Sequence, residues 1–260
     1  MLLAIDMGNT CITIGIYDDD RRRAIGRLAT DRKRTDDQYA VELRDLLDIN
    51  GISSSDITGA VLCSVVPVLT RVISGAVYKI TKINPIVVGP GVKTGLDIKL
   101  DNPAQLGSDL VAGAVAAIAS YKLPCIIYDL GTANTISVIA KNGTFLGGII
   151  SAGIGISLDA LVSGTSQLPY ISLEKAERVI GTNTVDSMKS GLVFGTAAMI
   201  DGLASRIENE LGEPATLVAT GGRAKEIVPY CQRDIAVDEF LLLDGLKLIY
   251  ERNAFKKQIS

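Results

Sequence analysis

Two short stretches place an acid, a glycine and a small polar residue at the end of an apolar run. The first is Asp6-Met7-Gly8-Asn9-Thr10, and the second is Asp129-Leu130-Gly131-Thr132-Ala133. A glycine lets the backbone approach a ligand closely, adjacent backbone amides can bind phosphate oxygens, and a carboxylate can hold hydrated Mg²⁺. These residue types therefore suit a site for a metal-bound polyphosphate.

The two stretches lie about half of the 260-residue chain apart, and an apolar strand-like segment follows each turn. The same pattern is also ordinary hairpin chemistry, so either copy alone leaves a plain turn and a ligand site equally open. The duplication favours the ligand site, because two facing turns would clasp a triphosphate. It also predicts two lobes, 1–120 with the first turn and 121–260 with the second.

A third acid, Asp109, is predicted to lie in the first turn of an apolar helix that Ser108 caps and that ends near Tyr121. Its spacing leaves two roles open, a complement to the helix dipole or a base for a substrate hydroxyl. The chain contains no histidine, which excludes Ser/His/Asp and Cys/His catalysis. Carboxylates or lysines must do any acid–base work, and this suits phosphoryl transfer.

Composition indicates a globular protein with no extended charged footprint. Hydrophobic residues make up 47%, charged residues 21%, and the net charge is −3. Nucleic acid and anionic membranes are therefore not expected partners. The N-terminus lacks a basic leader, the apolar stretch 110–119 is too short to cross a bilayer, and the four cysteines have no zinc-type spacing. We expect a soluble, cytoplasmic protein.

Periodicity and turn signals predict alternating strands and helices. The expected strands are 2–17 as a hairpin, 21–29, 59–64, 85–88, 125–141 as a second hairpin, 144–150 and 217–219. The expected helices are 39–47 with Thr35 as cap, 69–79, 108–121, 157–161, 173–179, 184–210 and 240–250. Gly191, Gly195 and Gly202 on the longest helix favour close helix packing. Thr220-Gly221-Gly222 could receive a nucleotide or form only a corner.

Together these stretches resemble the type III pantothenate kinases of the acetate and sugar kinase, Hsp70 and actin superfamily. The resemblance spans nearly the whole chain. Besides the two turns it rests on Arg34-Thr35-Asp36-Asp37, Ser64-Val65-Val66-Pro67, the Asn-Pro-x-x-Leu-Gly-x-Asp segment 102–109, Gly147-Gly148, Ser163-Gly164-Thr165, and Ser190-Gly191 through Ile200-Asp201-Gly202. It implies a duplicated actin-like (ribonuclease H-like) α/β fold, two lobes with mixed sheets flanked by helices.

The resemblance also implies an enzyme, a homodimer that phosphorylates pantothenate with ATP and Mg²⁺ to 4′-phosphopantothenate, the first step of coenzyme A biosynthesis. Asp109 corresponds to the proton acceptor, and Asp129 to the ligand of a monovalent cation, K⁺ or NH₄⁺. Asp6 would lie near Mg²⁺. The implied ATP contacts are Asp6, Met7, Gly8, Asn9, Thr10, Thr13 and Thr132. The implied pantothenate contacts are Leu100, Gly107, Ser108, Asp109, Leu110 and Thr184.

Three positions depart from the family pattern. Leu110 replaces a usual arginine, Leu100 a frequent tyrosine, and Ala152 stands where a Pro-Gly pair is usual. The loss of a charge-assisted contact at Leu110 is worth about 1.5–3 kcal/mol. These changes affect the expected binding of the substrate more than that of the phosphates. Two alternatives stay open beside pantothenate kinase. They are a catalytically weak nucleotide-binding paralogue with a regulatory role and a related kinase for another small alcohol.

Overall fold

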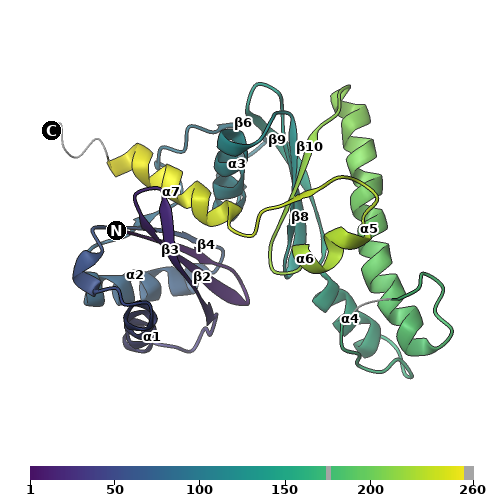
Figure 1. Cartoon of the computed structure of the whole chain (residues 1–260), viewed down its shortest axis with the longest axis horizontal. Coiled ribbons are helices and arrows are strands. Elements are labelled where there is room, and N and C mark those ends of the chain that lie inside the picture. The colour runs from purple at the N-terminus through teal and green to yellow at the C-terminus, as the bar shows by residue number, and fades with distance from the viewer. Residues whose placement is uncertain (174–176, 255–260) are drawn as a thin grey trace. The chain divides into compact units, whose positions relative to one another are not determined.

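The computed structural model describes residues 1–173 and 177–254 (Figure 1). The chain forms two compact units, each built around one mixed sheet. The first unit contains Met1–Leu96, Asp101–Ala119 and the chain from Leu241 onward. The second contains Asp97–Leu100 and Ser120–Phe240. Each unit is described by itself.

The sheet of the first unit has the strand order β3-β2-β1-β4-β5. Its strands are β1 (Leu2–Met7), β2 (Cys11–Asp18), β3 (Arg21–Ala29), β4 (Gly59–Ser64) and β5 (Ile86–Val87). β1 pairs antiparallel with β2 on one side and parallel with β4 on the other. Strand β1 is therefore central, and its end at Asp6 is flanked by two other strands.

Helices cover both faces of this sheet. They are α1 (Asp36–Ile49), α2 (Pro67–Thr81), α3 (Ser108–Ser120) and α7 (Leu241–Ala254). Ile5, Ile14 and Ile16 share a buried cluster with residues of α1 and α2, so these strand positions face that helical layer. Because side chains alternate along a strand, Asp6 lies on the opposite face, which α7 partly covers.

Local sequence explains where α1 and α2 begin. The Thr35 hydroxyl accepts from the Gln38 backbone N–H and the Gln38 side chain accepts from the Thr35 N–H, a complete capping box. Pro67 begins α2, where its missing N–H costs nothing. The predicted cap and the predicted strands 21–29 and 59–64 are confirmed.

The second unit repeats the plan of the first, with strand order β11-β10-β7-β8-β9-β6. Its strands are β6 (Asp97–Ile98), β7 (Cys125–Leu130), β8 (Ala133–Ile139), β9 (Thr144–Ala152), β10 (Thr216–Thr220) and β11 (Ala236–Val237). β7 pairs antiparallel with β8 and parallel with β10, as β1 does with β2 and β4. The repeat that the two turns predicted therefore extends to the pairing of the strands around β1 and β7.

Helices α4 (Ile154–Ser163), α5 (Thr184–Leu211) and α6 (Ala224–Ile227) complete the second unit, and α5 is capped by Asn183. Tyr128 and Leu130 of β7 belong to the buried cluster that these helices share, so Asp129 between them faces the other side.

Single-turn 3₁₀ helices occur in both units. They are η1 (Ser54–Asp56) and η2 (Pro103–Gln105) in the first and η3 (Val228–Tyr230) in the second.

The division into units differs from the expected 1–120 and 121–260 at two segments. Helix α7 belongs to the first unit because Leu243, Leu246 and Ile249 are buried there and the helix contacts β1, β2 and β4. Asp97–Leu100 belongs to the second unit, where β6 extends the sheet beside β9. Packing, not chain order, decides both memberships.

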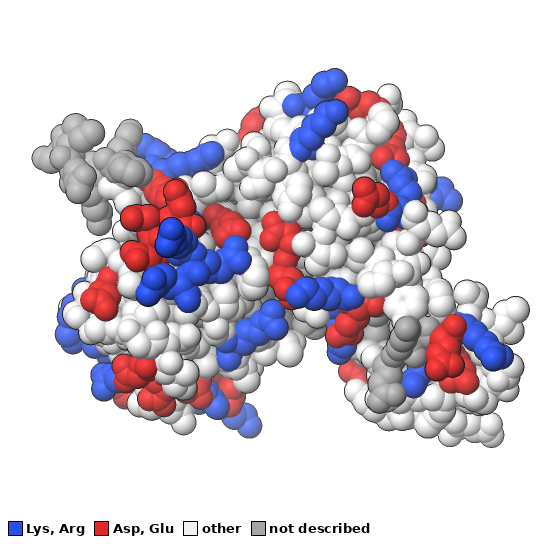
Figure 2. Space-filling model, viewed as in Figure 1, with Lys and Arg blue, Asp and Glu red and all other residues white. Residues whose placement is uncertain are grey.

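One expected helix is wrong for the residues that can be checked. Leu173 and residues 177–179 are not helical, and residues 174–176 of the predicted helix 173–179 lie outside the described residues. Within the described chain no helix is long and apolar enough to span a membrane. Basic and acidic side chains are intermingled on the face seen in Figure 2, in keeping with the small net charge.

Candidate active site

The first glycine turn is a compact connection between β1 and β2. The Gly8 N–H donates to the Cys11 carbonyl at 3.0 Å, and the Thr30 hydroxyl donates to the Gly8 carbonyl at 2.8 Å. A Cβ at Gly8 would lie 3.1 Å from the Cys11 carbonyl oxygen, so a side chain there would require the turn to shift slightly. Asn9 and Thr10 are exposed at its tip, whereas the Met7 side chain is fully buried. Met7 can therefore offer a ligand only its backbone.

Asp6 lies in a row of residues that crosses three strands. Its register partners are Thr13 on β2 and Cys63 on β4. The Cys63 thiol donates to Asp6 Oδ1 at 3.0 Å. Burial raises the pKa of Asp6 from its ordinary value of 3.8 to about 6, the Cys63 hydrogen bond opposes the rise, and the charge of Asp109 adds to it. Among the described residues no cation contributes to this pKa, so a bound divalent ion would supply the missing positive charge.

Asp109 lies in the first turn of α3, near Asp6. The Leu110 N–H donates to Asp109 Oδ1 at 2.9 Å. Burial raises the pKa of Asp109, and hydrogen bonds from backbone N–H groups oppose the rise. A Cβ at Gly107 would lie 2.3 Å from Asp109 Oδ1, so any side chain at position 107 would displace the carboxylate. The sequence placed Asp109 correctly in the helix, and the structure brings it within electrostatic range of Asp6.

Ser108 does not cap α3 as the sequence suggested. The Gly107 carbonyl accepts from the Val111 N–H, so Gly107 occupies the cap position. The Ser108 hydroxyl instead accepts from the Ser64 N–H at 3.1 Å and donates to the Ser64 carbonyl at 3.3 Å. This joins the start of α3 to the end of β4, the neighbour of β1. The two contacts explain how Asp109 reaches the strand end that carries Asp6.

The second glycine turn follows Asp129 on β7. The Gly131 N–H donates to the Ala133 carbonyl at 3.3 Å, and Thr132 is exposed. Thr135 on β8 and Thr220 on β10 are in register with Asp129 and share its face. The Thr135 hydroxyl is buried and has no hydrogen-bond partner within the described chain. Carboxylate and hydroxyl oxygens suit a hard cation, so this donor set fits the monovalent ion that the sequence suggested.

Gly221 shapes the same place. Its φ of +88° lies in the left-handed region, and a Cβ there would lie 2.4 Å from Asp129 Oδ1. The glycine keeps the space beside the carboxylate open. The sequence left Thr220-Gly221-Gly222 undecided between a ligand turn and a corner, and the structure places this turn directly beside Asp129.

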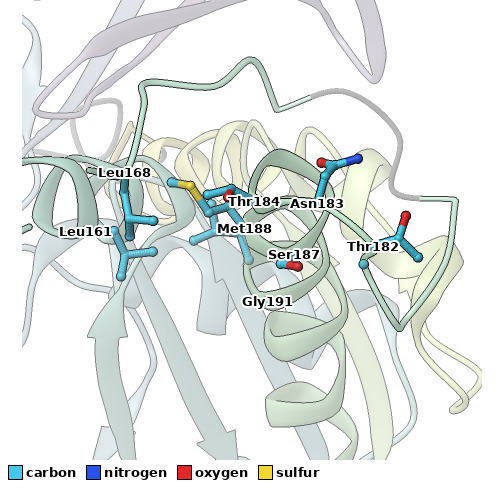
Figure 3. A pocket seen from close by; sticks show the side chains of 10 residues that line it. Leu161, Leu168, Thr182, Asn183, Thr184, Ser187, Met188 and Gly191 are labelled. Carbon is cyan, nitrogen blue, oxygen red and sulfur yellow. The ribbon is translucent and has the colours of Figure 1, made fainter.

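Leu100 and Thr184, the predicted substrate residues of the second unit, contact different parts of that unit. Leu100 follows β6, and its Cδ2 lies 3.8 Å from where a Gly147 Cβ would be. Thr184 begins α5 and lines a pocket of about 750 Å³ (Figure 3). The pocket is lined by Leu161, Leu168, Gly181, Thr182, Asn183, Thr184, Ser187, Met188, Gly191 and Leu192. None of these residues belongs to the second turn.

A metal ion in either turn would not rest on a protein cage. In the described part of the chain no cluster of three or more histidine, cysteine, aspartate or glutamate side chains could hold one. Mg²⁺ commonly takes only one or two carboxylates and completes its shell with phosphates and water. Asp6, with its neighbour Asp109, fits that mode. Apart from its place near a strand end, nothing in the sequence marks Cys63 as part of this site.

Comparisons with known proteins agree with this architecture. The family model for type III pantothenate kinase matches residues 2–206. Type III pantothenate kinases from an Exiguobacterium species and from Halalkalibacterium halodurans are 45% and 42% identical over 253 residues. These matches cover 97% of this chain and 99% and 100% of the two relatives.

Solved structures add support for the fold. One is a conserved putative Baf family transcriptional activator from Campylobacter jejuni, with a TM-score of 0.60 at 21% identity, covering 97% of this chain and 99% of the other. Another is a ROK hexokinase from Thermus thermophilus, with a TM-score of 0.53 at 15% identity, covering 98% and 99%. The expected sugar-kinase-like and actin-like α/β fold is confirmed. By the match to residues 2–206 and the full-length relatives, the chain belongs to the type III pantothenate kinase family.

Proposed function

We propose that this protein transfers the terminal phosphoryl group of ATP to the primary hydroxyl of pantothenate, the first step of coenzyme A biosynthesis. One observation carries the proposal. Asp6 and Asp109 come from segments far apart in the sequence, yet they lie close enough to interact electrostatically, beside a glycine turn. One carboxylate for the metal and one for the hydroxyl proton are what metal-assisted phosphoryl transfer asks of a protein without histidine.

Asp109 is the proposed base. Burial raises its pKa, which makes the carboxylate a better proton acceptor than an exposed aspartate. Its Oδ1 is held by the Leu110 N–H at 2.9 Å. This hydrogen bond keeps the carboxylate oriented at the start of α3 while it accepts the proton of the attacking hydroxyl.

Asp6 is the proposed Mg²⁺ ligand, and the turn after it is the proposed phosphate site. The exposed tip residues Asn9 and Thr10 can donate hydrogen bonds to phosphate oxygens, as can Thr13, which neighbours Asp6 in the sheet. Gly8 and Met7 would contribute backbone groups. When bound, Mg²⁺ neutralises charge on the phosphates, and the protein's part is to hold them in line.

In the second unit we propose that Asp129 binds K⁺ or NH₄⁺ and that Thr132 contacts ATP. The buried Thr135 hydroxyl, in register with Asp129, supports a cation there because it has no partner within the described residues. The proposed pantothenate contacts are Leu100, Gly107, Ser108, Asp109, Leu110 and Thr184. Ser108 is already bonded to Ser64, so its role would be to position the segment.

We further propose a cytoplasmic homodimer. On α5 a Cβ added at Gly191, Gly195 or Gly202 would meet nothing within 4 Å, so this helix presents small residues to open space. Ile150 and Ile156 of the same unit are exposed. Exposed apolar side chains and exposed small helical residues on one unit suit close packing of two identical copies. The four free cysteines suit a reducing compartment.

One observation favours a second candidate. No lysine or arginine in the part of the chain that the structure describes contributes to the pKa of Asp109, and the neighbouring Leu110 carries no charge. Position 110 therefore offers no positive charge to a substrate carboxylate. A kinase for an uncharged small alcohol, or a catalytically weak nucleotide-binding protein, would tolerate that.

The test is ADP release from ATP, Mg²⁺ and K⁺, with and without pantothenate. Asp109→Asn should abolish pantothenate-dependent release, whereas Asp45→Asn, a matched change at an exposed residue of α1, should not affect it. A folded parent protein that binds MgADP but shows no release at high pantothenate would refute the proposal. Release with a neutral hydroxylated amide alone would favour the second candidate.

A further inference from the structure

A row of four residues crosses the first sheet at the level of the glycine turn. Cys63 on β4 pairs with Asp6 on β1, Asp6 pairs with Thr13 on β2, and Thr13 pairs with Arg27 on β3. Residues in direct register on neighbouring strands present their side chains to the same face. Arg27 therefore shares the face of Asp6 and stands at the end of this row.

The charge of Arg27 also reaches the glycine turn. Burial raises the pKa of Cys11, the first residue of β2, and Arg27 is the cation that opposes this rise. The end of β3 is fastened to the same turn, since the Thr30 N–H donates to the Thr10 carbonyl at 3.0 Å and the Thr30 hydroxyl donates to the Gly8 carbonyl at 2.8 Å. The strand that carries Arg27 is thus held against the proposed phosphate site.

The Arg27 side chain is exposed and makes no ion pair or hydrogen bond within the described residues. Two other arginines of the same unit are held by acids. Arg22, on the same strand, binds Asp244 at 2.9 Å, and Arg34 binds Glu42. An arginine side chain without a partner, on the face of Asp6 and beside a phosphate-type turn, is placed to bind an anion.

The spacing of the row suits a polyphosphate. Two strand spacings of about 4.8 Å separate β1 from β3, so Asp6 and Arg27 start roughly 10 Å apart. A phosphate over Thr13 would lie between a metal held by Asp6 and the guanidinium of Arg27. A chain of two or three phosphates with its divalent ion fills such a gap, whereas an uncharged nucleoside would leave Arg27 without a partner.

We propose that Arg27 binds the terminal phosphates of the nucleoside triphosphate, opposite the metal at Asp6. This inference rests on the proposed function and assigns one more residue to its ATP site. The guanidinium group donates hydrogen bonds to phosphate oxygens. It neutralises the negative charge of the phosphates that the divalent ion at Asp6 does not neutralise. Arg27 thereby distinguishes nucleotides with a polyphosphate from adenosine.

The experiment measures binding by calorimetry to the full-length, ligand-free protein, with MgATP, MgADP and adenosine as probes. Arg27→Gln should weaken MgATP and MgADP about 10- to 100-fold, the loss of a charge-assisted contact, and leave adenosine unchanged. Arg27→Lys keeps the charge but not the fork and should lose less. Arg21→Gln is the matched control, because Arg21 is an exposed arginine at the far end of the same strand.

Two results would overturn the assignment. One is MgATP affinity of Arg27→Gln within twofold of the parent protein, and the other is an equal loss in Arg21→Gln. These outcomes are separate from failure of the proposed function. A parent protein that binds MgATP but does not phosphorylate pantothenate would refute the substrate and leave the Arg27 measurement decisive for the phosphate site.

Discussion

Replacing Asp6 by asparagine should make the ligand-free protein more stable at neutral pH while removing its metal site. Burial, together with the charge of Asp109, makes the ionised Asp6 unfavourable in the folded state. Asparagine has nearly the same shape without the charge. It also keeps an oxygen that can accept from the Cys63 thiol, now 3.0 Å from Asp6 Oδ1. The substitution therefore removes a cost and preserves the contact.

The pKa of Asp6 sets the size of the effect. A rise from 3.8 to about 6 corresponds to about 3 kcal/mol between the charged and neutral forms. The new amide N–H group has no partner in the present contacts, which costs about 1 kcal/mol. Asp6 is half-buried, so solvent reduces the first figure somewhat. We expect Asp6→Asn to raise the free energy of unfolding by about 1–2 kcal/mol above pH 7.

The pH dependence has a definite sign. The folded protein holds the Asp6 proton more tightly than the unfolded chain, so stability falls as the pH rises from 3.8 to about 6. Asparagine does not titrate, so the Asp6→Asn variant does not lose this stability as the pH rises. The stability difference between variant and parent should therefore grow from about pH 4 to about pH 6 and level off at higher pH.

Urea unfolding of both proteins at about pH 5 and pH 8, in a chelator and followed by circular dichroism, measures this difference. Asp45→Asn removes an exposed acid from α1 and should change little. Calorimetry should show that Asp6→Asn no longer binds MgADP. An Asp6→Asn protein that is equally or less stable than the parent at pH 8, or whose difference does not change with pH, would refute the reasoning about burial.

Three further outcomes follow from single contacts. Gly107→Ala should lower kcat at least 100-fold and leave the MgADP affinity unchanged. The added methyl carbon would lie 2.3 Å from Asp109 Oδ1 and would displace the carboxylate, whereas an equal loss of MgADP binding would indicate a misfolded turn. Thr35→Ala removes the capping box of α1 and should cost about 1 kcal/mol of unfolding free energy with kcat unchanged, measured by urea unfolding beside Thr35→Ser, which should recover most of the loss. Asp129→Asn should abolish any difference in turnover between KCl and NaCl at equal ionic strength, and a persisting difference would place the monovalent ion elsewhere.

The sequence determined the local elements well because neighbouring residues decide them. Alternating apolar residues fix 21–29 and 59–64 as strands, and Thr35 with Gln38 fixes the start of α1. The two glycine turns, the absence of histidine and the place of Asp109 in the first turn of a helix could also be read from the chain alone. These features were enough to predict the fold class, the duplication and the family.

Contacts between distant segments were decided only by the tertiary structure. The Cys63 thiol on Asp6, the Ser108 hydroxyl on Ser64 and the place of Arg27 at the end of the Asp6 row all depend on strand register and on how α3 packs against β4. Helix α7 belongs to the first unit for the same reason, because its apolar face packs against β1, β2 and β4, which lie far earlier in the chain. Burial and register are properties of the assembled sheet, so no window of sequence encodes the raised pKa of Asp6 or the unpaired charge of Arg27.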